Sequence, residues 1–307
     1  MPCARLGRSP RPMFDLRYHV ASLAAVFLAL VIGILVGVGI SDRGYVDRAQ
    51  RGLLEQRIAK LQGDLGDART HADNLAAQQR ATQAFVTDTY PELMANRLRG
   101  KSIALVFLGP SDAHVRVSLQ QALADAGASG WVRVRALKFP LDIPQLDNTL
   151  AGDPALARYV GDARLPALGK SLAEEFAAGG KAPLWSTLAE QIVAERTGSE
   201  GRPADGVIVV RTAARQYDGT ARFLAGFYSG LIAAPVPVVG VETTDASRSS
   251  VKVFQRNGIS SVDDIDEPIG RFALTLLLDG AKAGHYGVKT SAADGVLPPL
   301  ETAPRSG

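Results

Sequence analysis

The chain has 307 residues, a formal net charge of +3 and a single cysteine, Cys3. That length allows about two domains, and so small a charge, with no basic patch interleaved with aromatic residues, makes no case for a nucleic-acid-binding protein. Because no cysteine follows Cys3, disulfides are excluded from the rest of the chain, and a body of roughly 200 residues must be stabilised by its hydrophobic core.

Residues 18–40 form an apolar segment that contains no Asp, Glu, Lys or Arg. About 20 apolar residues are enough to cross a bilayer, so this segment predicts a transmembrane helix. A cleaved signal peptide is the alternative, but its apolar core is usually about 7–15 residues long and ends at a cleavage site of small residues. Residues 38–43 contain no such site, which favours an uncleaved membrane anchor.

The same segment carries a small residue at every fourth position. Positions four apart lie on one face of a helix, and small residues there let two membrane helices approach closely. The sequence therefore predicts a helix-packing face that favours self-association, although small residues are also common in membrane helices in general. The face consists of Ala21, Ala25, Ala29, Gly33 and Gly37.

Residues 1–17 form a basic N-terminus with four arginines, namely Arg5, Arg8, Arg11 and Arg17. Positive residues beside a membrane segment favour the cytoplasmic side. We therefore expect a cytoplasmic N-terminus, with the bulk of the chain, from Ser41, beyond the inner membrane. Met13 is an alternative start of the chain, and a start there removes Cys3 and three of the arginines.

Residues 45–95 show apolar or small side chains at alternating spacings of four and three. This is the heptad seam of a coiled coil, so a helical stalk is predicted, which Pro91 is expected to end. The alternative is one amphipathic helix packed on its own domain, but a self-associating stalk fits better after the small-residue face. The seam consists of Leu54, Ile58, Leu61, Leu65, Ala68, Ala72 and Leu75.

Residues 100–290 change to short apolar runs separated by helical stretches. That alternation is typical of a mostly parallel sheet with helices on both faces, so an α/β domain is predicted. A mostly helical region at 142–198 and a last helix at 268–278 accompany the sheet, and the proline-rich residues 291–307 are predicted to form a disordered tail. The predicted strands are 102–108, 132–138, 207–211 and 236–241.

Catalytic signatures are absent from the sequence, which has no nucleophile elbow, phosphate-binding loop, zinc-protease motif or dinucleotide fingerprint. The four histidines fall in four different predicted elements, which argues against a shared site. We therefore expect a non-enzymatic protein without a catalytic, cofactor-binding or metal site. The acidic run at 263–267 is interpreted as a cap for the helix that follows, in preference to a cation site.

One candidate site remains at the carboxyl ends of the predicted strands, where open parallel sheets bind ligands. Polar loops begin there at residues 109, 211 and 242. Asp112, Arg211 and Arg215 are the candidate residues of a ligand rim. An ordinary polar rim of loops explains the same residues, and both interpretations stay open.

Residues 15–30, continued by Gly33, Gly37 and Gly39, closely resemble the N-terminus of the MctB family, and three short stretches between 259 and 288 also match its pattern. These actinobacterial proteins are described as copper transport outer-membrane proteins. The likeness covers most of the chain in order. It implies a role in copper efflux or copper homeostasis in the cell envelope, with an outer-membrane channel, and copper as the transported ion follows from this resemblance alone.

The residues themselves point elsewhere on two counts. Copper prefers thiolate, thioether or imidazole ligands, but Met1, Met13 and Met94 all lie outside the predicted domain, so we expect no copper site in it. A barrel in the outer membrane needs strands of about ten residues that alternate apolar and polar. The predicted strands are shorter and uniformly apolar, which favours the inner membrane for the single anchor.

Two functions follow. The first is the function of the family, copper efflux by a membrane-anchored envelope protein that is a component of an oligomeric channel. The second is a non-enzymatic scaffold or regulator that docks cell-wall or division machinery through its α/β domain, and the predicted interaction features favour it. An enzyme or small-ligand binder that uses the rim of the sheet is a third class, which a cleft rich in buried charge would support.

Overall fold

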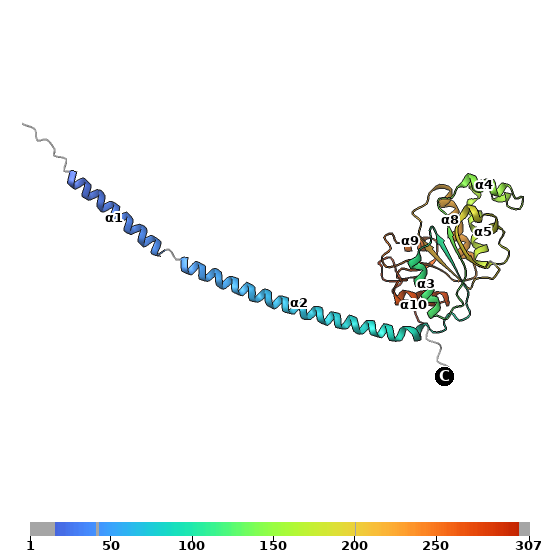
Figure 1. The fold of residues 1–307 in the computed structure, drawn as a ribbon, viewed down its shortest axis with the longest axis horizontal. Coiled ribbons are helices and arrows are strands. Elements are labelled where there is room, and N and C mark those ends of the chain that lie inside the picture. Colours follow the sequence, from blue (N-terminus) through green and yellow to red (C-terminus); the bar gives the residue numbers. More distant parts are fainter. Residues whose placement is uncertain (1–15, 41–42, 200, 301–307) are drawn as a thin grey trace, which may run out of the picture. The chain divides into compact units, whose positions relative to one another are not determined.

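The computed structural model describes residues 16–40, 43–199 and 201–300 of the chain (Figure 1). The chain divides into two compact units, Met1–Arg80 and Ala81–Gly307. The first unit is helical and the second contains the sheet. Cys3, Arg5, Arg8, Arg11 and the alternative start at Met13 lie outside the described residues.

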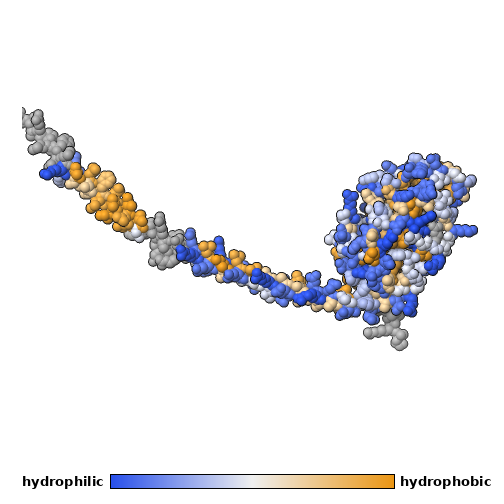
Figure 2. Space-filling view, in the orientation of Figure 1, coloured by the Kyte–Doolittle hydropathy of each residue, from blue (hydrophilic) through white to orange (hydrophobic). Residues whose placement is uncertain are grey.

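The predicted transmembrane helix is α1, which spans Leu16–Ile40. Its stretch Arg17–Gly39 is apolar and long enough to cross a membrane. The 23 residues of that stretch extend about 35 Å at 1.5 Å per residue, against about 30 Å for the hydrocarbon core of a bilayer. Figure 2 shows the apolar surface of this helix, whose large side chains are exposed, for example Leu23 at 63% and Leu28 at 65%. The small-residue face on α1 stays a prediction as a site of self-association.

The predicted stalk is the 52-residue helix α2, Arg43–Met94. Pro91 lies inside this helix, so our expectation that it ends the element is wrong by three residues. The large side chains of the seam are more than half exposed, which leaves them available to a partner. They are Leu54 at 56%, Ile58 at 52%, Leu61 at 66%, Leu65 at 51% and Leu75 at 59%. The coiled coil itself stays a prediction.

The last turns of α2 belong to the domain. Met94 and Leu98 are fully buried in its core, and the Tyr90 hydroxyl donates a hydrogen bond to Asp125 at 2.9 Å. The Arg271 guanidinium also lies over the Tyr90 ring, 5.8 Å from its centroid. The domain therefore begins before the boundary predicted at residue 100, because Met94 at the end of α2 and Leu98 in the turn that follows pack into its core.

The domain is built on a seven-stranded sheet with the order β3-β2-β1-β4-β5-β6-β7. All neighbouring strands are parallel except β2 and β3, which are antiparallel. The mostly parallel α/β fold predicted from the sequence is thus confirmed. The four predicted strands correspond to β1 Ile103–Leu108, β2 Trp131–Leu137, β4 Gly206–Arg211 and β5 Val238–Val241.

Three strands were not predicted, and each lacks the buried apolar run that marks the others. The edge strand β3, Val193–Gly198, is polar and mostly exposed, and it falls where we expected helix. The strands β6, Ser260–Val262, and β7, His285–Tyr286, are too short to show an alternation of apolar and polar residues. Edge and very short strands escape prediction because one or both of their faces need no apolar side chains.

Helices cover both faces of the sheet, as predicted. On one face lie α5, Leu165–Ala178, and α8, Asp218–Ala233. On the other lie α3, Ala113–Asp125, and α10, Pro268–Leu278 (Figure 1). Shorter helical elements are α4 Ile143–Ala151, η1 Ala157–Tyr159, η2 Asp162–Arg164, α6 Pro183–Thr187, α7 Ala189–Ile192 and α9 Val251–Arg256.

Helices α5 and α8 pack with their backbones in contact. A Cβ atom added to Gly226 of α8 would overlap the carbonyl oxygen of Pro166, and one added to Gly230 would overlap that of Lys170. On α5, a Cβ added to Gly169 would overlap the carbonyl oxygen of Phe223. Only glycine allows two helices to approach this closely.

The segment 291–300 lies on the domain, although we predicted a disordered tail from residue 291. Leu297 packs against the core. The backbone amide of Asp294 donates to the carbonyl oxygen of His285 at 3.1 Å, and the backbone amide of His285 donates to the Asp294 carboxylate at 2.8 Å. Prolines restrict the unfolded chain as well, so a proline-rich segment needs few contacts to be ordered. Residues 301–307 lie outside the described residues.

Candidate functional site

The strand order places a topological switch point between β1 and β4. From β1 the chain proceeds to β2 on one side, while β4 and β5 continue the sheet on the other. In open sheets of this kind ligands bind in the crevice outside the carboxyl ends of the strands, where the order reverses. The strands that end there are β1 at Leu108, β4 at Arg211 and β5 at Val241.

A cleft of about 700 Å³ lies at this switch point. All three residues of the predicted ligand rim line it, so the structure brings Asp112, Arg211 and Arg215 together. As a site of ligand binding the rim stays a prediction. The lining consists of Asp112, Val115, Val210–Arg215, Val241–Thr243 and Asp245–Ser250.

The loops after β1 and β4 are held against each other at the base of the cleft. The Thr212 hydroxyl donates to the carbonyl oxygen of Pro110 at 2.6 Å, and the Ala213 amide donates to that of Leu108 at 2.9 Å. Gly109 has a φ of +128°, and a Cβ there would clash with the Ala213 backbone. Glycine is therefore required for this close approach.

Asp112 is used by the fold itself. It is the N-cap of α3, and its Oδ1 atom accepts hydrogen bonds from the amides of His114 at 2.9 Å and Val115 at 3.1 Å. A carboxylate at this position satisfies amides that have no partner within the helix and complements the helix dipole. Asp112 therefore shapes the wall of the cleft, and its charge is already neutralised in part.

Three arginines line the cleft, and sequence reasoning identified two of them. Arg211 is half-buried, whereas Arg215 and Arg248 are exposed. The Arg215 guanidinium lies over the Tyr217 ring, 5.5 Å from its centroid. Within residues 16–40, 43–199 and 201–300, none of the three forms an ion pair.

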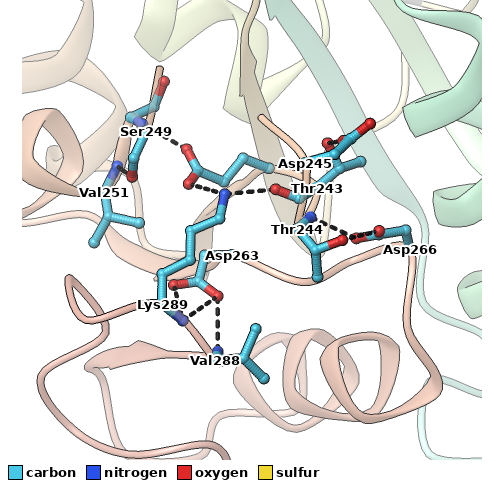
Figure 3. Close-up of polar contacts among 11 residues, drawn as sticks. Thr243, Thr244, Asp245, Ser249, Val251, Asp263, Asp266, Val288 and Lys289 are labelled. Atoms are coloured by element: carbon cyan, nitrogen blue, oxygen red, sulfur yellow. Dashed lines mark hydrogen bonds and ion pairs between the residues drawn. The ribbon is translucent and has the colours of Figure 1, made fainter. Parts of the chain in front are cut away.

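The loop after β5 is fixed by Lys289, as Figure 3 shows. The Lys289 ammonium donates to the buried Glu242 carboxylate at 2.8 Å and to the Thr243 carbonyl oxygen at 2.6 Å. Glu242 also accepts a hydrogen bond from the amide of Ser250. A buried carboxylate needs such partners, and this one connects the strand end to the C-terminal part of the domain.

The acidic run at 263–267 does not cap α10, which corrects our interpretation. The N-cap is Glu267, and its side chain makes no capping hydrogen bond. Asp263 instead accepts the amide of Val288 at 2.9 Å, and Asp266 accepts the amide of Thr244 at 2.8 Å (Figure 3). Asp263 and Asp266 thus tie the segment around β6 to its neighbouring loops, because their carboxylates accept hydrogen bonds from backbone amides there.

Asp264 differs from its neighbours because it is fully buried and neither carboxylate oxygen has a hydrogen-bond partner among the described residues. Burial, reinforced by the charges of Asp263 and Asp266, raises its pKa to about 7. Burial also raises the pKa of Asp263, while the amides of Val288 and Lys289 oppose that rise. Asp264 is therefore a titratable group inside the domain.

Sequence reasoning missed Glu242, Arg248 and Lys289. The polar stretch after β5 contained a signal for the first two, because it follows a buried strand whose end was predicted to lie at the rim. Lys289 gave none, since it lies 47 residues beyond its partner. Within the described part of the chain, no group of three or more His, Cys, Asp or Glu side chains is arranged to hold a metal ion.

Comparison with known proteins gives one family. The model of the family described as "Copper transport outer membrane protein, MctB" matches residues 13–298. Proteins named copper transporter MctB from Mycobacterium bovis and from two strains of Mycobacterium tuberculosis are 26% identical to this chain over 327 aligned positions, which cover 90% of this chain and 96% of each relative.

Proposed function

Because this chain belongs to the MctB family of copper transport proteins, we propose that it takes part in copper efflux as a membrane-anchored protein of the cell envelope. The observation that carries this proposal is the extent of the match, which reaches from residue 13, before the membrane helix, to residue 298 at the end of the domain. The alignment with the relatives that are named copper transporters covers 96% of the length of each.

We propose that the anchor lies in the inner membrane, with the N-terminus in the cytoplasm and the α/β domain on the other side. Helix α1, the one apolar helix of membrane-spanning length among the described residues, supports this arrangement. So does Arg17 at its N-terminal end, with three further arginines before it in the sequence, because cytoplasmic flanks carry the excess of positive charge.

We further propose that the protein self-associates through α1 and α2, and that the assembled form is the channel component. The support comes from two adjoining features. Small residues repeat every fourth position along α1, and apolar residues follow them in heptad spacing along α2. Exposed leucines such as Leu61, at 66%, are costly to leave in water, since burial of one such side chain is worth about 1.5–3 kcal/mol.

Replacing Leu61 by glutamate is expected to weaken self-association by about tenfold or more, because the charge would be buried at a core position of the coiled coil. Leu53→Glu is the matched control, since Leu53 is also exposed, at 61%, but lies outside the seam. A membrane two-hybrid assay measures self-association of both variants. In the same assay, replacement of Gly33 and Gly37 by leucine is expected to lower the signal. Equal signals for Leu61→Glu and Leu53→Glu would contradict the seam.

A strain that lacks this gene is expected to accumulate copper under copper load, and complementation with the wild-type gene is expected to restore the lower level. The measurement is total cell copper, with total zinc as the control for a general envelope defect. If copper stays unchanged, or if zinc rises in parallel, copper efflux is not the function of this protein.

The second proposed function is a non-enzymatic scaffold or regulator that docks cell-wall or division machinery through its α/β domain. The exposed seam of α2 supports a protein partner for such a scaffold, because an apolar face of this kind suits another protein as well as a second copy of the chain. Cross-linking through single cysteines introduced at Leu61 or Leu65 separates the two. A symmetric dimer supports self-association, whereas cross-links only to another envelope protein support the scaffold.

A further inference from the structure

The cleft at the switch point is lined by three carboxylates and three arginines. Its three carboxylates each have a partner: Asp112 is bonded to the amides of α3, Glu242 to Lys289, and Asp245 to the Thr243 hydroxyl at 2.6 Å. The hydroxyl lowers the pKa of Asp245 and keeps it ionised. The arginines of the same cleft have no such carboxylate partner among the described residues.

Those arginines come from two loops that face the same space. Arg211 is the last residue of β4, where its backbone is held in register opposite Leu108 of β1, so the base of this side chain is fixed by the sheet. Arg215 follows four residues later in the same loop, and Arg248 comes from the loop after β5. Guanidinium groups bind carboxylate and phosphate oxygens with two parallel hydrogen bonds, which makes such a set a recognition device for oxyanions.

The size and remaining lining of the cleft suit a small molecule. Its volume of about 700 Å³ lies within the range of about 300–1,000 Å³ that is common for small-molecule sites. Hydroxyl groups of Ser247 and Ser249 share the lining. These groups offer hydrogen bonds to the neutral part of a ligand, while the arginines take its charge.

We propose that this cleft binds a small organic anion, carrying phosphate or carboxylate groups, through Arg211, Arg215 and Arg248. The N-terminus of α3 takes no part, because the Asp112 carboxylate already occupies its first amides. Binding therefore depends on the guanidinium groups, so replacing these arginines one at a time tests the proposal.

The test uses the full-length chain in detergent, with pyrophosphate and citrate as the two probes, titrated by calorimetry at constant ionic strength. Wild-type protein is expected to bind at least one probe, and Arg211→Gln and Arg215→Gln are each expected to weaken that binding by about tenfold, as loss of a charge-assisted bidentate contact predicts. Stronger binding of pyrophosphate identifies a phosphate-bearing ligand, and stronger binding of citrate a carboxylate-bearing one.

Arg256→Gln is the matched control, because it removes the same charge from the far end of α9 and Arg256 does not line the cleft. It is expected to leave binding unchanged. Because Arg215 is exposed, its replacement does not threaten the fold, and tryptophan fluorescence checks this for each variant. Absence of binding by both probes at millimolar concentration, or equal weakening by Arg256→Gln, would overturn the proposal, since the latter indicates unspecific charge attraction.

Discussion

Replacing Gly226 by alanine is expected to destabilise the α/β domain by about 3 kcal/mol, the upper part of the usual range for overpacked sites. The added methyl group would overlap the Pro166 carbonyl oxygen, so α5 and α8 must move apart along the face that they share. Helix propensity alone would make the alanine variant more stable by about 1 kcal/mol. The expected change in the free energy of unfolding therefore has the opposite sign to the one that helix propensity predicts. Urea unfolding of the full-length chain in detergent measures the change.

Tryptophan fluorescence reports on this domain alone, since both tryptophans lie in it, Trp131 on β2 and Trp185 on α6. Gly152→Ala is the matched control. Its Cβ would meet the nearest atom, the Thr149 carbonyl oxygen, at an ordinary 3.5 Å, so its effect is expected to stay within about 0.5 kcal/mol. If Gly226→Ala is as mild as the control, the two helices do not pack through glycine.

The second large effect is expected at Asp264. Its pKa is raised from 3.8 to about 7 in the folded domain, so the folded state binds a proton more tightly than the unfolded chain. The stability contributed by that proton is complete below pH 3.8 and is lost as the pH rises through 7. The full shift corresponds to about 4 kcal/mol at about 1.4 kcal/mol per pH unit, and this is an upper bound because the surroundings relax around the charge.

Asp264→Asn is expected to remove this loss, because the amide keeps the shape of the neutral acid and cannot ionise. The variant should match the wild type only below about pH 3.8, exceed its melting temperature by a margin that grows between about pH 3.8 and 7, and keep that margin at higher pH. Thermal unfolding across that range measures the difference. Asp263, whose raised pKa gives a slope of the same sign, and His285, whose lowered pKa gives the opposite sign, remain in both proteins. The difference between the two profiles therefore reports Asp264 together with its charge coupling to Asp263. Parallel pH profiles for the two proteins would contradict an ionising Asp264.

How much the sequence predicted depended on burial. The central strands β1, β4 and β5 were predictable because both of their faces are covered, which forces long apolar runs such as Ile103–Leu108. The edge strand β3 was not predictable, because it is mostly exposed and needs no apolar run. The strands β6 and β7 were not predictable either, because they are too short to show a periodic pattern. The start of the domain was misplaced for a related reason, because Met94 and Leu98 continue the apolar spacing of a helix and the sequence does not show what they pack against.

The same distinction holds at the candidate site. Asp112, Arg211 and Arg215 were predictable because the ends of parallel strands share one edge of a sheet, so local sequence specified a common place. Arg248 required the path of the loop after β5, and the contact between Lys289 and Glu242 required the tertiary fold. Cooperation between distant residues is not encoded in any short stretch, which explains why Asp264 could not be distinguished from its acidic neighbours.

The ion pair between Lys289 and Glu242 also affects when the domain can complete its folding during synthesis of the chain. Domains fold as units while the chain emerges with its N-terminus first, so the membrane helix leaves the ribosome long before the residues that complete the cleft. Until Lys289 emerges, Glu242 lacks its counter-ion, and an unpaired carboxylate at a buried position weakens a fold by about 3–5 kcal/mol. A prematurely terminated chain that ends before Lys289 would therefore carry the membrane helix together with a destabilised domain.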